Sequence, residues 1–110
     1  MNEIQLAINV ATKREDLRTY KVGAVAIRKD GTKVFSRNEG VKVPTPSAHA
    51  EARLMKKAGH GSTVYVARVI ADGSPALARP CPRCMALLVS YKVKKVHYTT
   101  SDGIETITLN

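Results

Sequence analysis

Two short motifs constrain this chain more than any other feature: H-A-E at residues 49–51 and P-C-P-R-C at residues 80–84. One histidine and two cysteines form the ligand set of a catalytic zinc site, in which a fourth position stays open for water. Glu51 is left over as a base that can move the proton of that water. A fold that uses both motifs must bring two distant segments of the chain to one point.

The spacing of apolar residues predicts three helices and five strands around these motifs. The helices are expected at residues 3–18, 48–58 and 81–91, and the strands at residues 22–28, 32–37, 63–70, 94–100 and 104–109. A turn and a loop are expected between residues 71 and 80. Each motif therefore opens a helix, where free N–H groups and the helix dipole favour thiolates and developing negative charge.

The turn between the last two predicted strands fixes their relative direction. Only residues 101–103, with the sequence S-D-G, separate these strands. A parallel crossover needs a dozen or more residues, so this connection permits only an antiparallel hairpin. The predicted fold is thus of the α/β class, with a five-stranded sheet whose last strand is antiparallel.

Length and composition favour a single cytoplasmic domain over residues 1–110. Hydrophobic residues make up 44% and charged residues 25% of the chain, which is ordinary for a globular protein. No apolar run approaches the ~20 residues that span a membrane, and no signal peptide is visible. The net charge of +9 favours phosphorylated or polyanionic partners, although the basic residues are dispersed and also fit a solvated surface.

The residues alone leave other interpretations of the cysteine pair open. A C-x-x-C pair can be a redox motif, but that motif is expected near the first strand of a thioredoxin-like order, and here the pair comes late. A structural zinc site would need a fourth Cys or His ligand. The spare histidines are His60, in a glycine-flanked loop, and His97, in a predicted strand, and neither stands at a motif spacing.

In combination, the H-x-E and P-C-x-x-C motifs resemble those of the cytidine and deoxycytidylate deaminase superfamily. The order of elements is similar over nearly the whole chain. The resemblance implies a three-layer α-β-α fold with a mixed sheet. It also implies a Zn²⁺ ion held by His49, Cys81 and Cys84, with Glu51 as the catalytic proton shuttle. The backbone N–H of Ala50 would bind a carbonyl group of the base.

The resemblance extends to residues that would bind the substrate. Tyr20 stands where free-cytidine deaminases have an aromatic residue that stacks on the base. Asn38 is similar to the family asparagine that hydrogen-bonds the sugar, and Glu39 follows it directly, one position before the sugar-binding Glu of that family. Arg79 and Arg83 add positive charge near the first cysteine, and this charge favours a phosphate.

Two features of the chain are typical of different branches of this superfamily. A histidine as the first ligand is typical of deoxycytidylate, tRNA-adenosine and polynucleotide deaminases. An antiparallel last strand is typical of the branch that acts on free cytidine-type substrates. The tRNA-adenosine and vertebrate polynucleotide enzymes instead have a parallel last strand with an added helix.

The function that we expect is zinc-dependent hydrolytic deamination of a cytosine base in a nucleoside or nucleotide, with release of ammonia. One alternative is deamination of single-stranded DNA or RNA, which the charge favours but the single Phe, the four Tyr and the lack of Trp disfavour. Another is a non-catalytic zinc-binding or nucleic-acid-binding module, against which the intact Glu51 argues. Small members of the superfamily usually assemble, so a homo-oligomer is expected.

Overall fold

The computed structural model describes residues 2–12, 20–37, 50–70 and 74–109. Its elements are, in chain order, α1 (Glu3–Thr12), β1 (Tyr20–Ile27), β2 (Lys33–Arg37), α2 (Ala50–Ala58), β3 (Thr63–Ile70), β4 (Pro75–Ala76), α3 (Pro82–Ser90), β5 (Lys95–Thr99) and β6 (Ile104–Thr108). All three predicted helices and all five predicted strands are present. The parts of the helices predicted at residues 13–18 and 48–49 lie outside the described residues. Within the described ranges, no helix is both long enough and apolar enough to cross a membrane.

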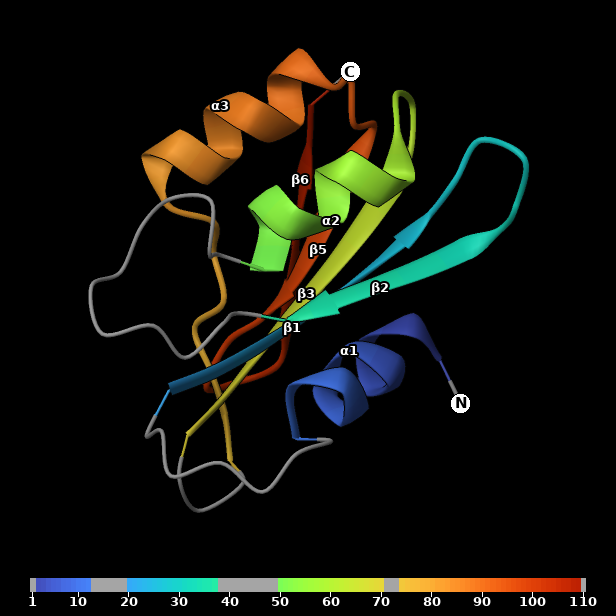
Figure 1. Ribbon diagram of the computed structural model, residues 1–110. Helices are drawn as coiled ribbons and strands as arrows, with labels where there is room; N and C mark the ends of the chain where they lie inside the picture. The colour runs from blue at the N-terminus through green and yellow to red at the C-terminus, as the bar shows by residue number, and fades with distance from the viewer. Residues whose placement is uncertain (1, 13–19, 38–49, 71–73, 110) are drawn as a thin grey trace.

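The sheet separates the helices into two layers (Figure 1). α2 and α3 cover one face of the sheet, and α1 covers the other. Alternate residues of β3 point to opposite faces, so Val64 and Val66 join the core under α2 and α3, while Ala67 packs with Val25 and Ala7 on the α1 side. The three-layer α-β-α arrangement is confirmed.

The strands follow the order β2-β1-β3-β5-β6. β1 pairs antiparallel with both β2 and β3, β3 and β5 run parallel, and β6 returns antiparallel against β5. α3 lies in the crossover between the two parallel strands. The predicted mixed sheet with an antiparallel last strand is confirmed, and the short β4 adds a sixth strand beside β3.

The sequence predicts a loop where β4 forms. Its two residues pair antiparallel with β3, with Ala76 opposite Arg68. The Thr99 hydroxyl holds this pairing, because it donates to the Ala76 carbonyl oxygen at 2.8 Å and accepts from the Arg68 N–H at 3.1 Å. These contacts join segments that are far apart in the chain, so no local pattern predicts them.

α1 packs very closely on β1 at Gly23. A Cβ atom at this position would lie 2.5 Å from the Ala11 nitrogen and closer still to the carbonyl oxygen of Ala7. Ala7 and Ala11 are themselves buried. Small residues on both elements therefore set the distance between this helix and the sheet.

Candidate active site

α3 begins with the cysteine pair. Cys81 is the N-cap, with extended backbone angles of φ −64° and ψ 164°. Its sulfur accepts a hydrogen bond from the Cys84 N–H at 3.5 Å, and its carbonyl oxygen accepts one from the Met85 N–H at 2.8 Å. Pro82 follows in the first turn, where its missing N–H leaves no helical bond unmade. The cap places both sulfurs at the positive end of the helix dipole.

The first described turn of α2 carries the carboxylate of the site. Ala50 is fully buried and Glu51 is only 6% exposed. The Glu51 side chain interacts with the Cys84 thiol at the start of α3, so the N-terminal ends of the two helices meet there. Leu54 and Met55, one turn further on, are buried in the core and fix α2 on the sheet.

Burial and a neighbouring carboxylate both act on the Cys84 thiol. Burial raises the pKa of the Cys84 thiol far above its ordinary value, and the Glu51 carboxylate and the Cys81 side chain raise it further. Two thiolates beside a buried carboxylate would be costly without a compensating positive charge. A divalent cation supplies that charge, and cysteine sulfur is a preferred ligand of zinc. The donor set therefore fits Zn²⁺.

The third expected ligand, His49, lies outside the described residues, and so do Asn38 and Glu39. Across the described ranges, no group of three His, Cys, Asp or Glu side chains is arranged to hold a metal. The cysteines are free thiols. The complete ligand set is still a prediction. The described residues supply two sulfurs of this set and the neighbouring carboxylate.

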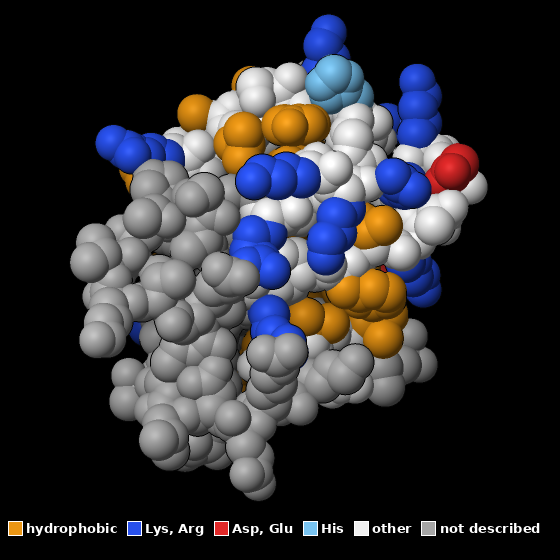
Figure 2. Space-filling view, in the orientation of Figure 1, with side chains coloured by type: hydrophobic (Ala, Val, Ile, Leu, Met, Phe, Trp, Pro, Cys, Tyr) orange, Lys and Arg blue, Asp and Glu red, His pale blue; other side chains and the backbone are white. Residues whose placement is uncertain are grey.

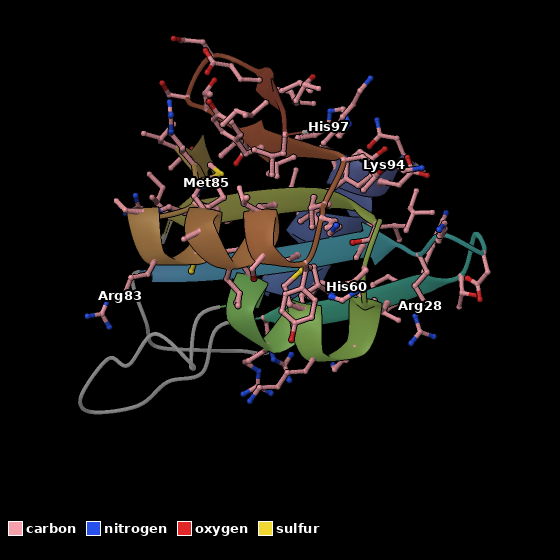
Figure 3. All side chains as sticks on the ribbon, turned by 90° about the horizontal axis from the view of Figure 1, so that it is seen from above. Arg28, His60, Arg83, Met85, Lys94 and His97 are labelled. Carbon is pink, nitrogen blue, oxygen red and sulfur yellow. The ribbon has the colours of Figure 1, made fainter. Side chains whose placement is uncertain are left out.

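The two described histidines lie away from the cysteine pair. His60 follows the C-terminal end of α2, and its ring centroid is 5.3 Å from that of Tyr91, the C-cap of α3. His97 stacks on Tyr65 at 4.6 Å and places Nδ1 2.7 Å from the Thr106 Oγ1. Figure 3 shows His60 at the opposite end of the two helices from their N-termini, and His97 beyond the sheet from them. Neither histidine is placed to become a fourth protein ligand.

Besides Ala50, three of the predicted substrate-binding residues are at least partly described. The backbone of Tyr20 opens β1, opposite Ile70 of β3. Arg79 is exposed, and its guanidinium interacts with the Tyr98 hydroxyl. The pKa of Tyr98 is raised, chiefly by its 2.8 Å hydrogen bond to Glu105, while Arg79 opposes this effect. Arg83 is exposed and points outward from the first turn of α3 (Figure 3). Arg79 is thus held beside the sheet, and Arg83 extends into solvent.

Comparison with known proteins gives two positive findings and one negative. The sequence model of a family described as the cytidine and deoxycytidylate deaminase zinc-binding region matches residues 2–100. No curated protein matches the chain. The fold is similar to the crystal structure of cytidine deaminase from Mycobacterium leprae, with 21% identity, a TM-score of 0.58, and coverage of 94% of this chain and 88% of that one. The fold is also similar to the crystal structure of cytidine deaminase from Mycobacterium tuberculosis, with 22% identity, a TM-score of 0.58, and coverage of 93% of this chain and 85% of that one.

Proposed function

Because the chain belongs to the family of cytidine and deoxycytidylate deaminase zinc-binding regions, we propose that it is a zinc-dependent hydrolytic deaminase of cytosine in a nucleoside or nucleotide. One observation carries the proposal: the buried Glu51 carboxylate lies beside the Cys84 sulfur, where the N-terminal ends of α2 and α3 meet. A purely structural zinc site has no use for a carboxylate in this place.

The proposed roles divide between metal binding and proton transfer. His49, Cys81 and Cys84 would hold Zn²⁺, which supplies a Lewis acid that makes water nucleophilic at neutral pH. Glu51 would take one proton from the water as it adds to the amino-bearing carbon, and would deliver that proton to the ring nitrogen. Glu51 would then move the second proton, from the added hydroxyl, to the amine, so that the carbon–nitrogen bond breaks and ammonia leaves as the carbonyl forms.

The surroundings of Glu51 support this role. Its position in the first turn of α2 places it at the N-terminal end of that helix, and its burial keeps it away from bulk water. Ala50 is fully buried and brings no bulky side chain to the same point. Its backbone N–H is the group proposed to bind a carbonyl of the base.

We propose a free cytidine-type nucleoside or its monophosphate as the substrate. The antiparallel pairing of β6 with β5 supports this proposal, since that topology is typical of the free-cytidine branch. Tyr20, Asn38 and Glu39 are proposed to bind the base and the sugar. Arg79 is the cation proposed to meet a phosphate, because Arg83 points away from the helix (Figure 3).

A substrate panel tests the proposal. The purified, zinc-loaded protein is incubated with cytidine, deoxycytidine, their monophosphates, adenosine and a single-stranded oligonucleotide, and ammonia release is measured. We expect ammonia from the cytosine nucleosides or their monophosphates. Release from adenosine alone, or from the oligonucleotide alone, would contradict the proposed substrate class.

The Glu51→Gln variant tests the proton shuttle separately. We expect ammonia release to fall by about 100-fold or more, with the zinc content unchanged, because the amide cannot accept the proton of water. Glu3→Gln is the matched control, since Glu3 lies on α1 across the sheet. A Glu51→Gln protein that binds zinc and keeps the wild-type rate would show that another group moves the proton.

A further inference from the structure

A groove lies at the β2 edge of the sheet, on the side of α2 that faces away from Glu51. Its volume is 780 Å³, within the range of small-molecule sites. The residues that line it include Leu6 and Val10 of α1, Phe35 and Arg37 of β2, and Arg53 and Lys57 of α2. We call it the edge groove. At about 100° per residue, Arg53 and Lys57 point away from the side of α2 that carries Glu51, so the edge groove is separate from the site at the cysteine pair.

The edge groove is positively charged. Among the described residues that line it, three side chains are cationic and none is acidic. The Lys57 ammonium is fixed there, since it donates to the Phe35 carbonyl oxygen at 2.8 Å. Arg28 adds a further positive charge behind it by donating to the Lys57 carbonyl oxygen at 2.6 Å. On this face of the molecule, Figure 2 shows Lys and Arg side chains next to exposed hydrophobic ones.

The groove also has an apolar part and an unused polar group. Phe35 is 42% exposed, and Leu6 and Val10 of α1 line the groove beside it. Ser36, another lining residue, is only 6% exposed, and its hydroxyl has no hydrogen-bond partner among the described residues. A buried hydroxyl without a partner is costly. A ligand with acceptor atoms would remove that cost.

These properties favour an anion that carries a ring. A second copy of the chain is disfavoured at this groove, because two copies that met there would bring their cationic side chains together. Addition of a β-strand is disfavoured too, because Lys57 occupies the Phe35 carbonyl oxygen on the free edge of β2. Arginine and lysine suit a phosphate group, and an exposed phenyl ring suits a planar base.

We propose that the edge groove is a second ligand site, which binds a nucleoside monophosphate. The base lies on Phe35, and the phosphate lies among Arg37, Arg53 and Lys57. This site stands on its own residues and does not depend on the deaminase activity. Its ligand class is a planar base joined through a sugar to a phosphate monoester.

Isothermal titration calorimetry at low salt tests the site. The protein is zinc-loaded and carries Glu51→Gln, so that no probe is turned over. The probes are AMP, adenosine and inorganic phosphate, and AMP is expected to bind more tightly than either of its parts. Arg37→Gln should weaken AMP binding by about tenfold or more, and Phe35→Ala should weaken AMP but not phosphate. Lys29→Gln, an equal charge change in the β1–β2 turn, should leave both unchanged.

Four outcomes would overturn the proposal. These are no AMP binding at low salt, equal weakening by Arg37→Gln and Lys29→Gln, displacement of AMP by cytidine, and a concentration-dependent dimer that Phe35→Ala abolishes. The third would place AMP in the site at the cysteine pair, and the fourth would make the groove a contact between copies. Failure of the deaminase assay would leave all four measurements interpretable, so the two proposals fail separately.

Discussion

At the scale of single residues, the site at the cysteine pair contains polar groups whose burial is unfavourable. The buried Glu51 carboxylate lies beside the buried Cys84 thiol, and both burial and the carboxylate raise the pKa of that thiol. The N-terminal dipoles of α2 and α3 offset part of this cost. A metal ion would offset the rest. We therefore expect zinc binding and stability to be coupled in this protein.

The first prediction concerns that coupling. Cys84→Ser should lower the zinc content well below one ion per chain and lower the melting temperature, because the hydroxyl replaces a thiolate ligand. Zinc is measured by elemental analysis and unfolding by circular dichroism. His60→Gln is the control and should keep the full zinc content, since His60 packs against Tyr91 at the other end of α3. Loss of zinc in the control would identify His60 as a ligand.

The second prediction concerns the contact between α1 and β1. Gly23→Ala should lower the free energy of unfolding by about 1–3 kcal/mol, because the new methyl group would overlap the backbone of Ala7 and Ala11. Urea titration measures the change. Gly31→Asn is the control, because nothing lies within 4 Å of a Cβ there and asparagine tolerates its φ of +90°. A Gly23→Ala protein as stable as the control would show that α1 can move away from the sheet.

At the scale of the elements, local patterns in the sequence predicted the helices and the longer strands. The short strand β4 and the exact start of α3 depend on contacts that those patterns do not contain. The apolar periodicity predicted β3 at the bounds that the structure has, because β-branched residues fill a central strand. Cys81 was expected as the first helical residue and is instead the N-cap, a difference of one position that depends on its sulfur accepting a hydrogen bond. β4 depends on Thr99, more than twenty positions away, so no local pattern could predict it.

The third prediction concerns β5 and the pH dependence of folding. Burial lowers the pKa of His97 in the folded protein, and the nearby Lys95 lowers it further, against a smaller opposing effect of Glu3. Neutral His97 therefore contributes its full stability above the unfolded pKa of about 6.5, and this contribution is lost as the pH falls below that value. His97→Gln should lose less stability than the wild type between neutral and mildly acidic pH. Equal losses in urea titrations of the two proteins would contradict the prediction.

At the scale of the whole molecule, motif spacing predicted the site at the cysteine pair but could not predict the edge groove. The H-x-E and C-x-x-C motifs carry their chemistry in a few adjacent residues, so the sequence alone identifies them. The edge groove combines Leu6, Phe35 and Lys57 from three separate elements. Only the packing of α1 and α2 on opposite faces of β2 brings them together. The sequence around a basic residue does not show which side chains from other elements will lie beside it in the folded protein.

The fourth prediction concerns the net charge. A single-stranded oligonucleotide should bind weakly at low salt, lose its binding as salt is raised, and release no ammonia. The charge of +9 gives an attraction that salt screens, while few aromatic side chains are available to stack on bases. Fluorescence anisotropy at two salt concentrations measures binding. Affinity that persists at high salt, together with ammonia release, would favour the polynucleotide alternative.

The parallel pairing of β3 with β5 also has a consequence for how the chain reaches its native state. Antiparallel neighbours can be joined by a tight turn, but β5 reaches its place beside β3 only through the longer crossover that contains α3. During synthesis, β1, β2 and β3 emerge early, and the interior beneath α2 still lacks Val96 and Tyr98. The nascent polypeptide therefore exposes part of its apolar core until β5 and β6 have been synthesised. A chaperone would be of most use at this stage.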